Sequence, residues 1–300
     1  MYHQEDISQC HFLRIYRNTD VFGDELHRYS IADGIRDKNV LGFDPYMVLT
    51  FKDNDIRTQV ALEKAKATSV EEALGDPNKR KTFQFFMDKT KIPMSGTDKT
   101  KGIEDYLPIT QYDTDEHRKM VIEDIAENWL KLSHDGKFHA LFATSSIIDA
   151  IIYYRLLRKR LGNLKITCLF DPTIDNNGGV EFKETGLVEI LEDYNRMYHK
   201  NFSIPTYAAF KKDVAMRLAH KEQYKTISKE SEKEKQLDLL IVVDQMLTGF
   251  DSKWLNTLYL DKVLYYENII QAFSRTNRLF GPDKPFGTIR YYRMPHTMAN

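Results

Sequence analysis

The sequence contains few cysteines, and none of them is placed to hold a metal ion or to build a disulfide framework. Cys10 and Cys168 are the only two in 300 residues, and no Cys-x-x-Cys pair or Cys/His cluster occurs. His134 and His139 are five apart across a glycine turn, which is a poor spacing for two ligands of one ion. We therefore expect a reducing compartment and no bound structural metal.

Long apolar runs and an excess of one charge are also missing. No apolar run reaches the roughly 18 residues that a membrane span needs. The N-terminus is polar and carries no signal peptide, so we expect a cytoplasmic protein without a membrane partner. The chain has 43 basic and 44 acidic residues, so any contact with a nucleic acid must come from a local patch of positive charge.

Two nucleotide-binding motifs are absent as well. No Gly-x-x-x-x-Gly-Lys-Ser/Thr loop occurs, because the nearest string, residues 96–102, neither fits that pattern nor follows a clear strand. No Gly-x-Gly-x-x-Gly follows a strand either, which disfavours a stand-alone α/β enzyme that uses a dinucleotide. A binding titration with NAD would test that alternative.

From about residue 113 onward, the sequence contains an alternation of helix and strand patterns. The short, nearly continuous apolar runs suit strands that are buried on both faces. Their alternation with helices implies right-handed crossovers, and therefore an α/β fold with a mostly parallel sheet covered by helices on both faces. Strands are expected at 138–143, 165–170, 239–243, 257–260 and 288–292, and helices at 113–132, 147–161, 186–199, 206–219 and 265–275.

The chain before this domain has a different composition. Its first part is a lead-in that ends in the first strand or strands, of which 46–51 is the clearer. The part that follows is charged and contains several glycines and prolines, which indicates a helical and loop insertion with short helices near 57–74 and 78–90. The expected divisions are therefore 1–51, 52–112 and 113–300.

Folds of this kind bind ligands at the loops that follow the carboxyl ends of the parallel strands. We therefore expect a ligand site among the loops at 144–146, 171–179, 244–251 and after 261. The loop at 244–251 follows the strongest strand pattern and contains Thr248, Gly249 and Asp251. Glycine allows a close approach of the backbone to a ligand. The same residues also fit a plain glycine turn with a helix cap.

Thr144, Ser145 and Ser146 lie between an expected strand and an expected helix. Hydroxyls and free backbone amides at the N-terminus of a helix can cradle an anion. They can equally be ordinary N-caps of that helix.

A second polar segment lies on one face of the last expected helix or at its end. Arg275 and Arg278 are three residues apart, and Gln271 precedes Arg275 by four, so the three side chains would project in one direction. Two neighbouring guanidiniums repel each other unless an anion lies between them, and a polyphosphate is such an anion. The alternative is a solvated helix face, or arginines that are paired with local acids.

The order and spacing of these segments resemble the later motifs of superfamily 2 helicase motors. Residues 138–146 resemble motif IV, 247–251 resemble motif V and 271–278 resemble motif VI. The similarity is closer still to the motor (R) subunit of type I restriction–modification enzymes, and it covers nearly the whole chain. It lies in the strings Phe-Ala-Thr-Ser-Ser (142–146), Phe-Asp-Pro-Thr-Ile-Asp-Asn (170–176), Leu-Thr-Gly-Phe-Asp-Ser-Lys-Trp (247–254), Gln-Ala-Phe-Ser-Arg-Thr-Asn-Arg (271–278), Val-Phe-Gly-Asp-Glu-Leu-His (21–27) and Ile-Arg-Asp (35–37).

This resemblance implies a second RecA-like domain of an ATP-driven motor. In that family two RecA-like domains clamp ATP; the first supplies the phosphate-binding loop and the Mg²⁺-binding acids, and the second supplies arginines. By resemblance, Arg278 would be the arginine finger, Arg275 a second γ-phosphate contact, and Gln271 the residue that orders them. Gly249 and Asp251 would face the nucleotide.

The resemblance also implies partners. Double-stranded DNA would be the track, and Thr144, Ser145 and Thr248 would touch its backbone, which positions DNA without reading its sequence. Sequence recognition would belong to a different subunit, so the methyltransferase and specificity subunits of the same complex are expected partners.

One departure from the family pattern concerns activity. The family's DNA-cleaving subunit is far longer, with a nuclease domain and a first motor domain, and no Asp-Glu-x-His box occurs in this chain. We therefore expect the chain to correspond to a second motor domain alone, with ATP and Mg²⁺ bound mainly by the first. Little or no ATPase activity and no nuclease activity are predicted for the chain by itself.

Other interpretations stay open. A RecA-like domain could serve as a non-catalytic docking module for partner subunits or DNA. The basic cluster of Arg155, Arg158, Lys159 and Arg160 could complement the C-terminus of a helix or contact DNA. The stretch 221–235 is expected to be a solvated linker or helix face.

Overall fold

The structure, a computed structural model, describes residues 30–97, 99–171, 179–243, 246–247, 250–265 and 267–299. The chain divides into two compact units, residues 1–40 and 41–300. In the described part of the first unit, helix α2 (Ile31–Arg36) begins with a capping box between Ser30 and Asp33.

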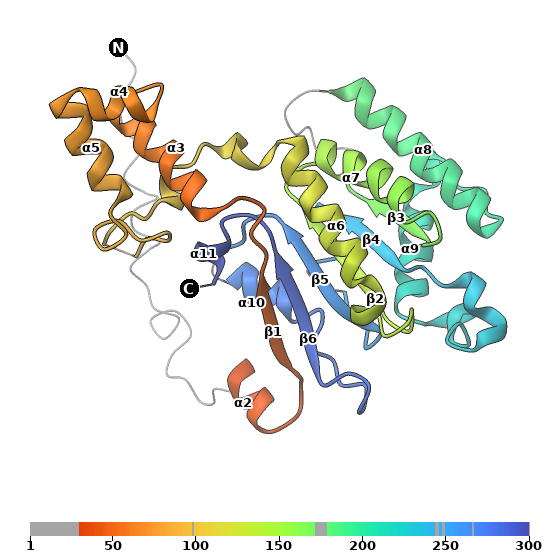
Figure 1. Cartoon of the computed structure of the whole chain (residues 1–300). Helices are drawn as coiled ribbons and strands as arrows, with labels where there is room; N and C mark the ends of the chain where they lie inside the picture. The colour runs from red at the N-terminus through yellow and green to blue at the C-terminus, as the bar shows by residue number, and fades with distance from the viewer. Residues whose placement is uncertain are drawn as a thin grey trace, which may run out of the picture. The chain divides into compact units, whose positions relative to one another are not determined.

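A six-stranded sheet forms the centre of the second unit (Figure 1). Its order is β1-β6-β5-β2-β4-β3, and each of its pairings is parallel. Every residue of β2, β3, β4 and β5 is buried, as the apolar runs predicted. The strands are β1 (Gly42–Met47), β2 (His139–Thr144), β3 (Ile166–Leu169), β4 (Leu239–Val242), β5 (Leu255–Asp261) and β6 (Phe286–Tyr291).

Helices cover both faces of this sheet. The crossovers from β1 to β2 and from β2 to β3 run in one direction across the sheet, and those from β3 to β4 and from β5 to β6 run in the other. Figure 1 shows α6 and α7 in front of the sheet and α9 and α10 behind it. Helix α8 belongs to the crossover from β3 to β4 but packs against α7, where Tyr154 of α7 donates to Asp193 of α8 at 2.9 Å. The helices are α6 (Asp115–Leu132), α7 (Ile147–Arg160), α8 (Val180–Tyr198), α9 (Tyr207–Leu218), α10 (Glu267–Phe273) and α11 (Pro295–Met298). The predicted α/β fold class, with a parallel sheet and covering helices, is thereby confirmed.

Two predicted boundaries were wrong. The first strand lies at Gly42–Met47 instead of 46–51, and it includes Pro45. A proline is tolerated there because β1 is an edge strand that pairs with β6 alone.

Helix α8 begins at Val180, before the predicted start. Gly186 lies inside it, where a β-carbon would come 2.6 Å from Ile151 of α7, so this glycine allows the two helices to pack closely.

The predicted helical insertion follows β1. Its three helices pack around two small apolar clusters of their own, one of which includes Ile56 and Ile103 and the other Ala61 and Phe83. The expected helix over 57–74 is divided, because Lys66 adopts a left-handed conformation (φ 52°) and ends the first helix. The elements are α3 (Asp53–Ala65), α4 (Val70–Gly75), α5 (Pro77–Met87), η2 (Glu104–Tyr106) and η3 (Ile109–Tyr112).

The 3₁₀ turn η4 (Ile204–Thr206) directly precedes α9. The charged stretch between α9 and β4 contains two more 3₁₀ elements, η5 (Glu222–Tyr224) and η6 (Glu230–Lys235). Cys168 is a buried free thiol in β3. Over the ranges given above, no helix is both long enough and apolar enough to cross a membrane.

Candidate functional site

The carboxyl edge of the parallel sheet brings together the ends of β2, β5 and β6. Thr144 ends β2, and Ser146 is the N-cap of α7, with its hydroxyl accepting from the Asp149 backbone amide at 3.0 Å. The hydroxyls of Ser145 and Ser146 both donate to Asp149 Oδ2, at 2.8 and 2.9 Å. One carboxylate therefore fixes both serines that follow the strand.

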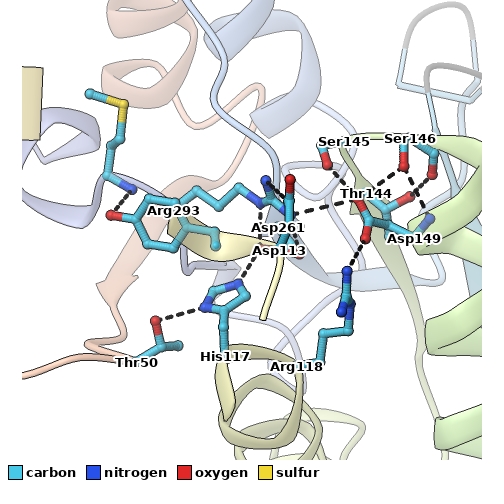
Figure 2. Close-up of polar contacts among 12 residues, drawn as sticks. Thr50, Asp113, His117, Arg118, Thr144, Ser145, Ser146, Asp149, Asp261 and Arg293 are labelled. Atoms are coloured by element: carbon cyan, nitrogen blue, oxygen red, sulfur yellow. Dashed lines mark hydrogen bonds and ion pairs between the residues drawn. The ribbon is translucent and has the colours of Figure 1, made fainter. Parts of the chain in front are cut away.

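A buried polar cluster lies beneath this loop (Figure 2). Asp261 ends β5 and is fully buried. Its carboxylate accepts from His117 Nε2 at 2.7 Å, from Arg293 Nε at 2.9 Å and from the Tyr153 hydroxyl at 2.9 Å. His117 Nδ1 in turn hydrogen-bonds to Thr50 Oγ1 at 2.8 Å. Segments far apart in the chain are thus joined at one carboxylate.

The charges in this cluster are compensated. Burial by itself raises the pKa of Asp261, but the hydrogen bond from His117 and the positive charge of Arg293 outweigh it and hold that pKa below its ordinary value. Burial also opposes the charge on Arg293, yet Asp261 raises the pKa of the guanidinium. A buried ion pair with this many hydrogen bonds fixes geometry, since removal of one partner leaves an unpaired charge.

The same cluster connects to the serines. Arg293 Nη2 lies 3.7 Å from Asp149, and Arg118 Nη2 donates to Asp149 at 2.9 Å. Arg293 also contacts Asp113 at 3.0 Å, so it spans the gap between β5, α7 and the loop before α6. The position of the Ser145–Ser146 loop is therefore set by charged residues from four separate segments.

The arginine segment lies elsewhere in the fold. Helix α10 ends at Phe273, so Arg275 and Arg278 lie just beyond the end of the helix, which is one of the two placements predicted. The Asn277 carbonyl accepts from the amide of Leu41, the residue before β1, at 2.7 Å. A β-carbon on Gly287, at the start of β6, would come 2.2 Å from Thr276 Oγ1. The segment is therefore packed at the amino edge of the sheet.

Asp251 was expected at the carboxyl edge, and this was wrong. No helix forms in the described part of the connection between β4 and β5, and residues 250–254 lie near the start of β5. The Trp254 carbonyl, for example, accepts from the amide of His139 at the start of β2. Asp251 is thereby brought to Arg278, whose Nε donates to Asp251 Oδ1 at 2.5 Å.

Arg275 lies beside this pair. Its guanidinium donates to the backbone carbonyls of Phe250 and Gln271, both neutral acceptors. Burial lowers the pKa of Arg275, the neighbouring Arg278 lowers it further, and Asp251 acts in the opposite direction. Two neighbouring guanidiniums are therefore accompanied by one carboxylate, which is paired with Arg278 and not with Arg275.

Lys284 supports the same segment and was missed from the sequence. Its side chain is fully buried, and Nζ donates to the carbonyls of Lys253 at 3.2 Å and Leu255 at 2.6 Å. Burial and the nearby charge of Arg278 lower the pKa of this ammonium to about 7. An isolated lysine in a loop sequence gives no signal that it will be buried, because the two carbonyls come from a distant segment.

Comparison with known proteins places the chain in a family. A family model described as type I restriction enzyme subunit R domain 3 matches residues 136–294, which is more than half of the chain. The chain belongs to this family. The matched part contains the sheet from β2 to β6, the Ser145–Ser146 loop and the arginine segment.

Relatives of the restriction subunit family agree with this assignment. The type I restriction enzyme SauCOLORF180P endonuclease subunit of Staphylococcus aureus (strain COL) is 33% identical over 282 residues, which are 91% of this chain and 25% of the relative. The SsaAORF53P endonuclease subunit of Staphylococcus saprophyticus is 30% identical with the same coverage. This chain thus spans about a quarter of the length of the curated relatives it matches.

One solved structure also matches this restriction subunit domain over most of its length. The ATP-dependent Type ISP restriction-modification enzyme LlaBIII bound to DNA matches 91% of this chain with a TM-score of 0.37 and 12% sequence identity. The match covers 13% of that enzyme chain.

The remaining residues predicted for the site of this restriction subunit domain have different environments. Gln271 is exposed on α10, and its carbonyl accepts from Arg275 Nε at 3.0 Å. Thr248 and Gly249 lie outside the described residues. The prediction that Thr144 touches DNA is contradicted, because its side chain is fully buried and its hydroxyl donates to the carbonyls of Ser146 and Val242. The strings at 21–27 and 172–176 also lie outside the described residues.

The basic cluster on α7 is occupied by local ion pairs. Arg155 pairs with Glu189 at 2.6 Å, Arg160 pairs with Glu123 at 2.9 Å, and Arg158 pairs with Asp193. These contacts favour the structural interpretation of the cluster over DNA binding.

The two histidines considered as a ligand pair have separate environments. His139 Nε2 lies 2.7 Å from His220 Nε2, whereas the ring of His134 lies against Phe138. Over the described ranges, no group of three or more His, Cys, Asp and Glu side chains could hold a metal ion.

Proposed function

We propose that this chain is the second RecA-like motor domain of the ATP-dependent, DNA-translocating and DNA-cleaving subunit of a type I restriction enzyme. Its membership of the type I restriction subunit family and its parallel sheet support this role. Arg278 is the arginine finger of the motor, and Arg275 is the second contact to the γ-phosphate.

The observation that carries this proposal is that two guanidiniums lie side by side and only one of them is paired with a carboxylate. Asp251 pairs with Arg278, while Arg275 has neutral carbonyl partners and a pKa lowered by burial and by the charge of Arg278. An added anion would relieve this repulsion, and a polyphosphate fits the planar fork of donors on arginine. In phosphoryl transfer such arginines stabilise charge that develops on the γ-phosphate.

The packing of the segment supports the same role. Thr276 and Asn277 are buried between the two arginines, and the Thr276 hydroxyl donates to the Phe273 carbonyl at 2.9 Å. The guanidiniums therefore extend from a backbone that is fixed against β6 and β1. A rigid backbone holds a charged group in place for a transition state without further ordering at the moment of reaction.

The remaining roles are divided among this chain, the rest of the subunit and the partner subunits. ATP and its Mg²⁺ are bound mainly by the first motor domain. This chain completes the nucleotide site: Gln271 orders the arginines, and Gly249 and Asp251 face the nucleotide. Ser145 and Thr248 contact the backbone of double-stranded DNA, which positions the track without reading bases. The methyltransferase and specificity subunits are the partners in the complex.

The proposal predicts that the 300-residue chain alone hydrolyses little or no ATP. An arginine finger stabilises a transition state only on a nucleotide that other groups hold. The measurement is the rate of phosphate release with ATP and Mg²⁺, for the wild-type chain and for Arg278→Ala. Robust Mg²⁺-dependent turnover that is unaffected by Arg278→Ala would overturn the assignment.

A further inference from the structure

Helix α5 of the insertion, together with the loop that follows it, carries a concentration of positive charge. Residues 77–91 contain five basic residues and one acidic residue, in a chain with 43 basic and 44 acidic residues in total. Apart from one that is half-buried, the basic side chains are exposed. They are Lys79, Arg80, Lys81, Lys89 and Lys91, and the acidic residue is Asp88. This set is called the α5 surface below.

Much of this charge is not neutralised. Lys79 pairs with Glu72, and Lys91 pairs with Asp88 at 3.4 Å. Arg80 donates to the Leu74 carbonyl, which carries no charge. Within the part of the chain that the structure describes, neither Lys81 nor Lys89 makes an ion pair. The α5 surface therefore keeps a net positive charge.

One face of the α5 surface combines lysines with an exposed aromatic ring. A shallow, open depression lies along the helix, and its lining includes Lys81, Gln84, Phe85, Asp88 and Lys91. These positions recur every three or four residues, so they lie on one face. Phe85 is 44% exposed, and the Lys91 ammonium lies 5.9 Å from the centre of its ring. The opposite face of α5 packs against the insertion through the buried ring of Phe83, which lies in the apolar cluster with Ala61.

Buried polar contacts fix the α5 surface relative to the sheet. Arg57 is buried and donates to the carbonyls of Phe86 at 2.8 Å and Ile92 at 2.7 Å, which anchors the end of α5 on α3. The buried Glu104 accepts from the backbone amides of His296 at 3.0 Å and Thr297 at 2.7 Å. Those residues belong to α11, which follows β6, so the insertion is attached at the same edge of the sheet as the Ser145–Ser146 loop.

We propose that the α5 surface binds the sugar–phosphate backbone of double-stranded DNA, as a contact additional to those of the sheet edge. The 11-residue helix is about 16 Å long, and duplex DNA carries on the order of ten phosphate charges over that length. Lysine ammoniums act as point charges on phosphates and do not read bases. The carboxylate of Asp88 is already paired with the ammonium of Lys91, so it does not repel the DNA phosphates. The choice of DNA as the ligand rests on the proposed function.

The test is the binding of a short fluorescent duplex to the full chain, measured by anisotropy over a range of salt concentrations. The variant is Lys81→Gln/Lys89→Gln. If both lysines neutralise a phosphate, the slope of log K against log salt falls by about 2, because each contact contributes about 0.9. The matched control is Lys211→Gln/Lys212→Gln, which removes the same charge from exposed positions on α9 and should leave the slope unchanged.

Three results would overturn the inference: an unchanged slope in Lys81→Gln/Lys89→Gln, no binding of the duplex by the wild-type chain at about 50 mM salt, or an equal fall in the α9 control. A single-stranded oligonucleotide of the same length is the second arm. Tighter binding of the single strand that is lost in Phe85→Ala would contradict a duplex site. Any of these failures leaves the role of Arg278 untouched, since that role is tested through ATP hydrolysis.

Discussion

Arg278 and Asp251 form an ion pair at 2.5 Å in which the two side chains are 43% and 60% exposed. Solvent screens such a pair, so it contributes little to the stability of the fold. Asp251 therefore holds the guanidinium in place without binding it tightly, and a phosphate oxygen can replace the carboxylate at little cost. An exposed pair of this kind suits the proposed role of Arg278, in which the guanidinium changes partners in each ATPase cycle.

The first prediction contrasts two Arg–Asp pairs of this chain. Arg278→Ala should change the free energy of unfolding by less than about 1 kcal/mol, since the pair is exposed. Arg293→Ala should cost about 3–5 kcal/mol, because it leaves Asp261 buried and partly unpaired. Urea denaturation of the purified chain measures both. A loss with Arg278→Ala as large as that with Arg293→Ala would show that the arginine segment is structural.

The second prediction concerns the close contact between β6 and the arginine segment. In Gly287→Ala the new methyl group would lie 2.2 Å from Thr276 Oγ1 and 2.8 Å from the Thr276 carbonyl, so the segment must move. We expect a loss of about 1–3 kcal/mol in the free energy of unfolding, and a lower ATPase rate in the whole subunit. Gly75→Ala is the control, because nothing lies within 4 Å of its β-carbon. Equal stability and activity of the two variants would refute this contact.

The third prediction is a loss of stability in acid. The pKa of Asp261 is lowered in the folded chain, against about 3.9 in the unfolded chain. Its contribution is therefore fully present above about pH 4 and disappears as the pH falls through the folded-state pKa. The free energy of unfolding, measured at a series of pH values, should decrease below about pH 4. Asp261→Asn should be less stable at neutral pH and show a weaker dependence on acid; an unchanged dependence would count against the network.

The fourth prediction concerns the paired rings of His139 and His220. Burial lowers their pKa values to about 4 and about 3, with the neighbouring ring contributing to the second shift, so both are neutral in the folded chain. The unfolded chain binds protons from about pH 6.5 downward while the folded chain does not, so stability should fall between about pH 6.5 and 4. His220→Phe keeps the stacking on Trp254 and removes one titrating ring. Its loss of stability between neutral pH and about pH 5 should be smaller than that of the wild type, and an equal loss would contradict the assignment.

Local signals made much of the fold predictable from the sequence. The apolar run at Leu239–Val242 forms a fully buried strand, because such a run has no polar face to expose to water. Ser146 caps α7, which is one of the two roles that its hydroxyl suggested. The family resemblance in the strings from 142 to 278 was also readable from the sequence, and the match to residues 136–294 confirms it.

The site residues that depend on distant contacts were not predictable in the same way. His117 and Asp261 are 144 positions apart, and no periodic pattern links them. One signal was present: a carboxylate directly ends the apolar strand Leu255–Asp261, and a charge placed there must find a partner. The location of Asp251 at the amino edge depends on the path of the connection between β4 and β5, which the composition of the loop does not specify.

The most direct test of the central claim is the translocation rate of the whole subunit, assembled with its partner subunits on DNA, when Arg278 is replaced. Arg278→Ala should lower ATP-driven translocation by about 10³-fold or more, while assembly and the stability of the domain are unchanged. Arg278→Lys, which keeps the charge without the planar fork, should be strongly impaired as well. Translocation by Arg278→Ala at the wild-type rate would contradict the account and favour a docking role for this domain.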